Sequence, residues 1–460
     1  MNSESVDVVV IGAGATGLSA AHALQRAGRS VVVLEARDRV GGRLWTDEID
    51  GVDLELGGQW VSPDQEELLR TIDELGLETF SRYREGESVY IGSTGERRTF
   101  EGEQLPVPPA VEKDMLRLTE LLDALAAQMD PAQPWTAPFA EELDRQSFTA
   151  WLESNSDEPE SRDNIAMFIA QAMLTKPAHS FSALQAVHMA ASAGSFSNLV
   201  DSEFILDKRV VGGLQLVPLT LAERLGDAVR LGADVERVRW SDDGVEVVAG
   251  DLVVSGRHLV VAVPPTVVSR IRFDPPLPTV QREARQHQSF GQVIKLHVTY
   301  PEPFWRAAGL SGTVFSPYEL VHEAYDNTNH GDSRGTLVGF VSDEKADEVL
   351  RMSADQRRDA ILASLSRYYG DEALTPSSYH ESDWTTEELG QGAYATSFDL
   401  GGLTRFGPTL REPVGPMRFG SSDVAGLGFQ HVDGALRVGA EMAAAIVSSD
   451  GPLSGSPARS

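Results

Sequence analysis

Apolar runs mark the start of the chain. Residues 6–11 form a nearly continuous apolar run, the pattern of a strand that is buried on both faces. Residues 15–27 have helical composition, residues 30–34 form a second apolar run, and residues 64–75 have the pattern of another helix. The order strand, helix, strand predicts that the chain opens with a parallel sheet of an α/β protein.

The middle of the chain is predicted to be mainly helical, and strand patterns return after it. The predicted helices cover residues 111–128, 146–152, 161–174 and 181–191. Strands are predicted at residues 235–240, 245–248 and 259–263, an antiparallel sheet within 291–341, a strand at 417–420 and a last helix at 431–447. This order predicts one domain from residues 1–80, 207–285 and 383–448, a second domain from residues 81–206 and 286–382, and a flexible tail over residues 449–460.

Composition limits the possible functions. The 460 residues include 69 acidic and 39 basic side chains, a formal charge of −30, which argues against nucleic acid and an anionic membrane as partners. The acidity favours a cationic ligand, or it serves only solubility. Without cysteine, disulfides, thiolate metal sites and cysteine-linked cofactors are excluded. Because the first residues lack a basic segment and no uncharged apolar stretch could span a bilayer, we expect a soluble cytoplasmic protein that binds no metal.

A glycine-rich turn carries the first chemical signal. Gly12, Gly14 and Gly17 follow the first predicted strand and open the first predicted helix, as a dinucleotide-binding fingerprint requires. Gly12 permits the tight turn, Gly14 lets the backbone approach a pyrophosphate, and Gly17 lets helix and strand pack closely. Glu35 ends the second predicted strand, where an acid binds ribose hydroxyls and disfavours a 2′-phosphate. Its position argues against the alternative, an unrelated turn with three glycines.

Two further segments indicate that the bound cofactor is FAD and not NAD. They read Glu-Ala-Arg-Asp-Arg-Val-Gly-Gly-Arg at residues 35–43 and Leu-Gly-Gly-Gln-Trp at residues 56–60. Here the chain resembles the flavin-containing amine oxidase family, in which the first segment follows the cofactor's phosphates and the second lies beside the flavin ring. Glycine would allow backbone to approach that ring. The resemblance implies FAD binding by Gly12, Gly14, Ala15, Thr16, Gly17, Glu35, Ala36, Arg37, Gly42, Arg43, Gly57, Gly58, Gln59, Trp60, Val235, Trp384, Asp423, His431 and Val432.

The resemblance covers nearly the whole chain and is greatest to bacterial members of the family that oxidise putrescine. It is carried by segments 57–65, 81–91, 174–196, 207–213, 325–347 and 430–435. It implies an α/β fold in which a Rossmann-like FAD-binding domain is built from the three separated segments and accompanied by a mixed sheet-and-helix substrate domain. It also suggests a homodimer. A disulfide reductase is excluded because the redox cysteine pair is missing.

Lys295 is expected to take part in catalysis. It lies in a strand pattern on the same face as His297 and Thr299, and from the residues alone it is either a solvated side chain or a catalytic one. The resemblance favours catalysis, because in the family this lysine holds a water against the flavin ring. Its charge would stabilise the anions that form when oxygen reoxidises the cofactor.

Tyr394 and His431 are expected to form a cage around the reacting amine. From the residues alone, Tyr394 is a core aromatic or a cation-binding ring, and His431 could cap the last helix. In the family, the position of Tyr394 forms one wall of an aromatic cage. The other wall is often a second tyrosine, and the matching residue here is His431. The resemblance therefore implies that both are catalytic and that Tyr394 also contacts the substrate.

Glu323 is the residue expected to select the substrate. It lies in a predicted strand over residues 319–325, with Glu319, Val321 and Tyr325 on the same face. By itself it is one acid among many, and most such acids are solvated. In the putrescine-oxidising relatives, the matching glutamate binds the second ammonium of the diamine.

The expected activity is oxidative deamination of a short aliphatic diamine by FAD and oxygen, with putrescine as the substrate. The products would be 4-aminobutanal, ammonia and hydrogen peroxide. The alternatives are an oxidase of longer polyamines or other amines, and a flavin-binding protein without turnover. Ala393 stands where many relatives carry a flavin-linking cysteine, so we expect non-covalent FAD.

Overall fold

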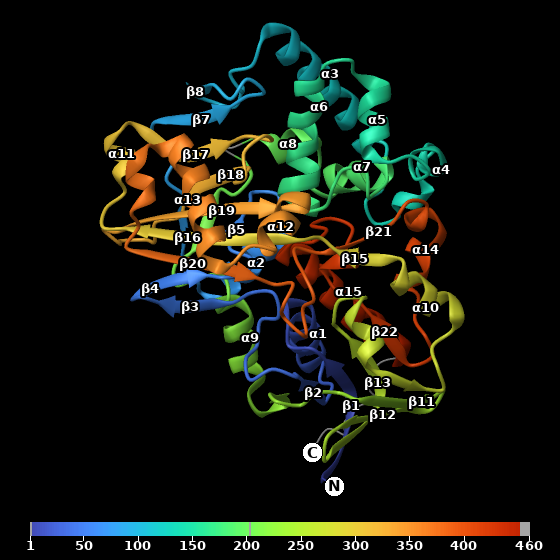
Figure 1. Ribbon diagram of the computed structural model, residues 1–460. Coiled ribbons are helices and arrows are strands. Elements are labelled where there is room, and N and C mark those ends of the chain that lie inside the picture. Colours follow the sequence, from blue (N-terminus) through green and yellow to red (C-terminus); the bar gives the residue numbers. More distant parts are fainter. Residues whose placement is uncertain (1, 202–203, 451–460) are drawn as a thin grey trace.

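The chain folds around two large sheets, shown in Figure 1 for the computed structural model, which describes residues 2–201 and 204–450. The eight-stranded sheet has the order β10-β2-β1-β13-β12-β11-β14, with β22 beside β13. Its strands are β1 (Asn2–Ile11), β2 (Val31–Leu34), β10 (Val229–Arg230), β11 (Arg237–Ser241), β12 (Gly244–Ala249), β13 (Leu252–Val261), β14 (Arg272–Asp274) and β22 (Met417–Phe419). They come from the three segments expected for the Rossmann-like domain, whose precise bounds remain a prediction.

The apolar run of β1 is buried on both faces. Val8 and Val10 pack with the helices that cover one face of the sheet, α1 (Ala15–Arg26), α2 (Glu66–Leu75), α9 (Leu216–Leu225) and α15 (Val432–Asp450). Val9 and Ile11 belong to a second core on the other face. Because β1 pairs in parallel with β2 and with β13, the predicted strand-helix-strand opening is confirmed.

The second sheet has seven strands in the order β20-β16-β19-β18-β17-β7-β8. Its strands are β7 (Glu87–Ile91), β8 (Arg97–Phe100), β16 (Val293–Tyr300), β17 (Leu310–Phe315), β18 (Glu323–Asp326), β19 (Gly335–Ser342) and β20 (Ser378–Asp383). The predicted antiparallel pairing within residues 291–341 is confirmed. On one face, Ile294 and Leu296 of β16 pack with residues of α13 (Ala354–Tyr369), and α12 (Asp343–Leu350) contributes to the same core.

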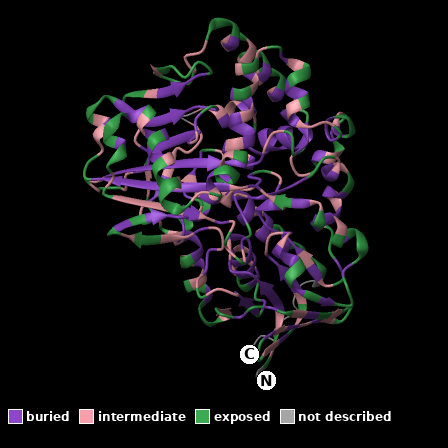
Figure 2. Cartoon of the chain, viewed as in Figure 1, coloured by how far each residue is buried: buried purple, intermediate pink, exposed green. Residues whose placement is uncertain are grey.

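Helices from the middle of the chain cover the other face of this sheet. They share a core with Phe315, Tyr325 and Phe340, and comprise α3 (Pro109–Ala126), α4 (Ala140–Leu143), α5 (Phe148–Asn155), α6 (Pro159–Ala166), the π-helix η2 (Met167–Leu174), α7 (Ala183–Ser192) and α8 (Phe196–Val200). Figure 2 shows buried residues concentrated along the central strands and exposed residues on the outer helices.

Short elements complete the fold. The small strands are β3 (Thr46–Ile49), β4 (Val52–Glu55), β5 (Trp60–Val61), β6 (Thr79–Ser81), β9 (Lys208–Val210), β15 (Gln288–Phe290) and β21 (Thr396–Phe398). The remaining helices are α10 (Thr279–Gln286), α11 (Phe304–Ala307), α14 (Gly402–Arg411) and the 3-10 turns η1 (Pro134–Thr136), η3 (Gly226–Ala228), η4 (Val267–Arg270), η5 (Asp371–Leu374) and η6 (Ser422–Val424). Within residues 2–201 and 204–450, no helix combines the length and the apolarity needed to cross a membrane.

The structure corrects the strand predicted over residues 319–325. Only Glu323–Asp326 forms a strand, and the residues before it form a turn. The turn arises because the Ser316 hydroxyl accepts the backbone N–H groups of Tyr318 and Glu319 at 3.1 and 3.2 Å. Glu319 therefore does not share the strand face of Glu323, and instead pairs with Arg367.

Two smaller expectations are also corrected. The predicted helix over residues 161–174 continues as a π-helix from Met167, so its side chains do not keep the α-helical spacing. The predicted flexible tail starts too early, because Ser449 and Asp450 still belong to α15. Its remaining residues, 451–460, lie outside the described residues.

Candidate functional site

A cavity extends from the glycine turn of the eight-stranded sheet to the inner face of the seven-stranded sheet. It brings together most residues that the sequence singled out: Gly12, Gly14, Ala15, Thr16, Glu35, Ala36, Arg37, Gly42, Arg43, Gly57, Gly58, Gln59, Trp60, Val235, Lys295, Glu323, Trp384, Tyr394, His431 and Val432. Gly17 and Asp423 are not among the lining residues. Among the described residues, no three His, Asp or Glu side chains gather as metal ligands.

The glycine turn has the geometry of a dinucleotide site. Gly12 has a φ of +98°, and a Cβ on Gly17 would lie 1.9 Å from the Gly12 carbonyl oxygen. Strand and helix can therefore meet only with glycine at both positions. A Cβ on Gly14 would have Gly42 Cα as its only neighbour within 4 Å among the described residues, at 3.9 Å. Space thus remains where the N-terminus of α1 faces the cavity, a place suited to phosphate.

Glu35 lies buried at the end of β2. Its carboxylate accepts the backbone N–H groups of Ala13 at 2.7 Å and Arg37 at 3.0 Å. These bonds hold the acid beside the glycine turn, at the edge of the cavity where a ribose would follow the phosphates.

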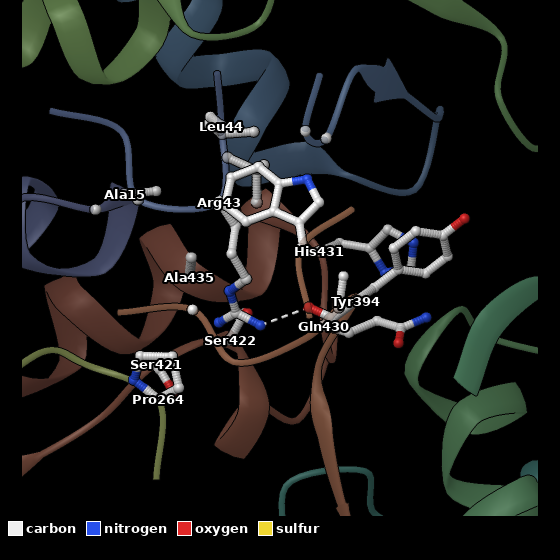
Figure 3. Close-up of a pocket in the computed structure, with 18 of the residues that line it drawn as sticks. Ala15, Arg43, Leu44, Pro264, Tyr394, Ser421, Ser422, Gln430, His431 and Ala435 are labelled. Carbon is white, nitrogen blue, oxygen red and sulfur yellow. Dashed lines mark hydrogen bonds between the residues drawn. The ribbon is translucent and has the colours of Figure 1, made fainter. Parts of the chain in front are cut away.

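Arg43 connects three segments of the cavity wall. It donates to the Tyr394 carbonyl at 2.6 Å (Figure 3), and also to the Ser422 hydroxyl at 3.1 Å and to the Asp423 carboxylate at 2.6 Å. Burial would raise the pKa of Asp423, but Arg43 and the N–H of Thr396 hold it below its usual value. Asp423 therefore acts on the cavity through Arg43 and does not face it.

Gly57 is required by a contact between two backbone segments. A Cβ at this position would lie 2.0 Å from the Arg43 carbonyl oxygen. This contact supplies a reason for glycine that does not depend on a nearby ring, although Gly57 also lines the cavity. The adjoining Leu56 carbonyl accepts a hydrogen bond from Trp384 Nε1 at 3.0 Å, which fixes that indole in the wall.

Lys295 is buried, so the solvated alternative is wrong. Its Nζ donates to the carbonyls of Glu55 at 2.6 Å and Gly57 at 2.8 Å, and to the Gln59 side chain. Water is excluded from Lys295 by the strands on either side of β16 and by the segment that contains these acceptors. Burial lowers the pKa of Lys295 to about 7.

Strand register aligns Lys295 with Glu323. Lys295 of β16 lies opposite Phe340 of β19, and Phe340 lies opposite Glu323 of β18. Residues directly opposite each other in antiparallel strands share a face, so all three side chains belong to the inner face. Because neighbouring strands are about 4.8 Å apart, the backbone positions of Lys295 and Glu323 are separated by about 10 Å.

Glu323 places a carboxylate in an aromatic environment. It is 6% exposed, and it accepts a hydrogen bond from the Tyr325 hydroxyl at 2.7 Å. Trp60 lies 5.6 Å from Tyr325 and 5.8 Å from Phe340, measured between ring centroids. A carboxylate surrounded by rings suits a cationic group that fits between them.

Tyr394 and His431 line the same cavity. The Tyr394 ring packs edge-on against Phe340 at 6.1 Å, and the preceding carbonyl, that of Ala393, accepts a hydrogen bond from the Thr175 hydroxyl at 2.8 Å. His431 directly precedes α15, but its Nδ1 lies 2.9 Å from the Phe429 carbonyl oxygen, so this nitrogen does not accept an N–H of the first helical turn. In Figure 3 the two rings project in the same direction from separate segments.

The sequence did not reveal several side chains of the wall. Phe168, Met173, Leu199 and Leu206 come from the helical region and its following segment, and Arg82 follows β6. None stands in a recognisable motif. Phe340 also faces the cavity, and the strand alternation that identified Lys295 could have found it once the strand pairing was known.

The fold and this cavity define a flavin-dependent amine oxidoreductase. A model of the "Flavin containing amine oxidoreductase" family matches residues 15–447, and the chain belongs to that family. It is 56% identical to a putrescine oxidase of Kocuria rosea, over 98% of this chain and 96% of the relative. It is 35% identical to a putative flavin-containing monoamine oxidase of Mycobacterium tuberculosis, over 96% of each chain.

Solved structures show the same fold. A putrescine oxidase bound to putrescine is 58% identical, superimposes with a TM-score of 0.97, and is matched over 97% of this chain and 100% of that one. A cyclohexylamine oxidase from Brevibacterium oxydans is 31% identical, with a TM-score of 0.91 over 96% of this chain and 99% of that one. The fold class expected from the sequence is confirmed.

Proposed function

We propose that this protein oxidises a short aliphatic diamine, with putrescine as its main substrate, and that it uses non-covalent FAD and oxygen. The observation that carries the proposal is the buried Glu323 carboxylate, on the same sheet face as Lys295 and about 10 Å across the strands from it. The likeness to putrescine oxidases over nearly the whole chain supports the same substrate.

The residues that line the cavity fit FAD. The N-terminus of α1 and Glu35 would bind the pyrophosphate and a ribose, and Gly57, Gly58 and Trp60 would lie beside the ring. When bound, FAD supplies the acceptor for the hydride and passes the two electrons to oxygen. The start of α15 lines the cavity at Val432, and its positive end would favour negative charge there.

The protein's own residues would orient the diamine. Glu323 would bind the ammonium that does not react, and Tyr394 and His431 would enclose the amine that does. The aromatic wall would exclude water around the reacting carbon. A monoamine lacks the charge that Glu323 can bind, so it would be held less firmly.

A peroxide-coupled screen of amines tests the proposed function. The purified holoprotein should form hydrogen peroxide fastest with putrescine and cadaverine, and much more slowly with butylamine and benzylamine, at equal low concentrations. Faster turnover of a monoamine would reject diamine selection by this site. No peroxide with any amine would favour a flavin-binding protein without turnover.

We predict that FAD is released by acid. The chain contains no cysteine, and Ala393 precedes the cage tyrosine, so no thioether to the flavin can form. Acid precipitation should leave all yellow colour in the supernatant, measured as flavin absorbance. Flavin that stays on the washed pellet would contradict non-covalent binding.

We predict that salt slows capture of a dication. The net charge of −30 should attract putrescine over a range set by the Debye length, which falls from about 30 to about 10 Å between dilute and moderate salt. Hence kcat/KM for putrescine should decrease with added NaCl. The kcat/KM for a monoamine, which has no second charged group, should change less. Equal responses would mean that the acidity serves solubility.

Assembly and location remain predictions. A homodimer and peroxide as the reduced product are expected from the likeness to the family, and cytoplasmic residence is expected from the sequence. Light scattering of the purified protein tests the homodimer. Fractionation of the cells that make the protein tests its location.

A further inference from the structure

The imidazole of His431 has a defined orientation in the cavity wall. Its Nδ1 lies 2.9 Å from the Phe429 carbonyl oxygen, and because a carbonyl can only accept, Nδ1 must carry the hydrogen of this bond. In the neutral ring, Nε2 is then the nitrogen with a free electron pair. The ring lines the same cavity as Tyr394 and Glu323. His431 is thus both a wall of this cavity and a potential proton acceptor, which a tyrosine would not be near neutral pH.

The Asp64 carboxyl group acts on this imidazole only through its charge, because among the described residues no hydrogen bond or ion pair joins the two. Asp64, in the segment before α2, is half-buried, and its Oδ1 has no hydrogen-bond partner among the described residues. Burial raises the pKa of Asp64, whereas a positive charge on His431 lowers it. Asp433 and Arg437 of α15 also act on Asp64 through their charges, and Tyr394, Glu323 and Lys295 line the same cavity as His431. The Asp433 carboxylate accepts the N–H groups of Glu67 and Leu68 and pairs with Arg437, so its charge is already compensated.

A diamine that binds with both amines protonated can be oxidised only after a proton acceptor takes the proton from the reacting amine. An aliphatic amine has a pKa of about 10, as lysine does, so it reaches the protein as an ammonium. Hydride can leave the adjacent carbon only when nitrogen has an electron pair to form the C=N bond. Glu323 would keep the far ammonium charged, so the site must distinguish the two ends of one molecule. A carboxylate at one end and an unprotonated imidazole at the other would make that distinction.

We propose that Nε2 of His431 takes the proton from the reacting ammonium; this role rests on the proposed function. The ammonium N–H bond breaks, its electron pair stays on nitrogen, and the proton binds Nε2. That pair forms the C=N bond as the carbon gives hydride to the bound flavin. Oxygen needs one proton in addition to the hydride to form hydrogen peroxide. The proton that His431 later releases supplies it.

The pH dependence of kcat/KM for putrescine tests this role. In the unchanged protein, kcat/KM should be nearly level from about pH 7 to about pH 9, because the imidazole accepts the proton. In His431→Gln it should rise about tenfold per pH unit, because only neutral amine from solution can react. The variant should lose about a hundredfold at pH 7, within the usual contribution of a general base, and recover most of it at high pH.

Further variants make the result specific. His431→Tyr restores an aromatic wall without a base, so it should show the same slope as His431→Gln even if the glutamine variant is unstable. His287→Gln is the control: His287 pairs with Asp399 at 2.8 Å and is not a lining residue of the cavity, so its profile should match the unchanged protein.

Binding without turnover gives a second readout. A diamine whose amine-bearing carbons carry no hydrogen cannot be oxidised, and calorimetry in buffers of different ionisation enthalpy counts the protons released when it binds. The unchanged protein should keep the proton on His431 and release almost none, whereas His431→Gln should release about one and bind more tightly as pH rises.

The outcomes separate this role from the proposed function. The base role of His431 would be overturned if the unchanged protein and His431→Gln had parallel pH profiles and released equal numbers of protons. That result would leave diamine oxidation intact. Failure of the unchanged protein to oxidise putrescine would overturn the proposed function itself.

Discussion

Glu323→Gln is expected to reduce kcat/KM for putrescine by about thirtyfold to several thousandfold, which corresponds to about 2–5 kcal/mol. The far ammonium of the diamine would lie in a cavity walled by Phe340, Tyr325 and Trp60, where water cannot replace a lost countercharge. The glutamine keeps the size of the side chain and can still accept a hydrogen bond from the Tyr325 hydroxyl. The loss would therefore report the charge.

Kinetics with butylamine distinguish a loss of diamine recognition from a loss of folding in Glu323→Gln. It has the same chain length as putrescine and no second charge, so Glu323→Gln should leave its kcat/KM almost unchanged or raise it. Glu319→Gln is a matched control, because Glu319 is also buried in this segment but pairs with Arg367 and does not line the cavity. Steady-state kinetics on both amines measure the effect. Equal losses for putrescine and butylamine would assign Glu323 to the fold.

Lys295→Met is expected to slow reoxidation of the reduced holoprotein by about a hundredfold to a thousandfold, the usual effect of removing one preorganised donor beside a developing oxyanion. Reduction by putrescine should change much less. The ammonium donates to the carbonyls of Glu55 and Gly57, and no carboxylate of the described residues forms an ion pair with it, so its charge is available to oxygen-derived anions. Stopped-flow absorbance measures the two half-reactions separately.

The same lysine should give reoxidation a pH dependence. Burial lowers the pKa of Lys295 to about 7, so its positive charge is present below that pH and is lost above it. The rate constant with oxygen should therefore fall as pH rises from about 6 to about 9, and Lys295→Met should abolish this trend. Lys176→Met is the control, because Lys176 is another buried lysine but donates to the Ser397 hydroxyl at 2.8 Å outside the cavity. A normal rate in Lys295→Met would leave Lys295 with a structural role.

Local patterns in the sequence predicted the dinucleotide half of the fold well. The runs in β1 and β2 are buried on both faces, Gly12 is required by its own φ of +98°, and Gly17 is required by its approach to the Gly12 carbonyl. Such signals depend on neighbours in the chain, so they can be read without the tertiary structure.

Other features depend on contacts between distant segments. The segment before Glu323 alternates like a strand, but the Ser316 hydroxyl bonds to two of its N–H groups and makes a turn. Burial of Lys295 depends on carbonyls more than 200 residues earlier in the chain, and no alternation pattern distinguishes it from a solvated lysine. Phe168 joins the wall only because the helical region covers the seven-stranded sheet. The roles of the site residues were inferred from the resemblance and not from the pattern of residues.

Anaerobic mixing of the purified holoprotein with putrescine tests the central claim most directly. The account predicts that one equivalent of putrescine bleaches the visible flavin band, that butylamine at the same concentration bleaches it far more slowly, and that oxygen restores the band with one equivalent of hydrogen peroxide. A flavin spectrum that putrescine leaves unchanged, or that butylamine bleaches equally fast, would contradict oxidation of a diamine selected by Glu323.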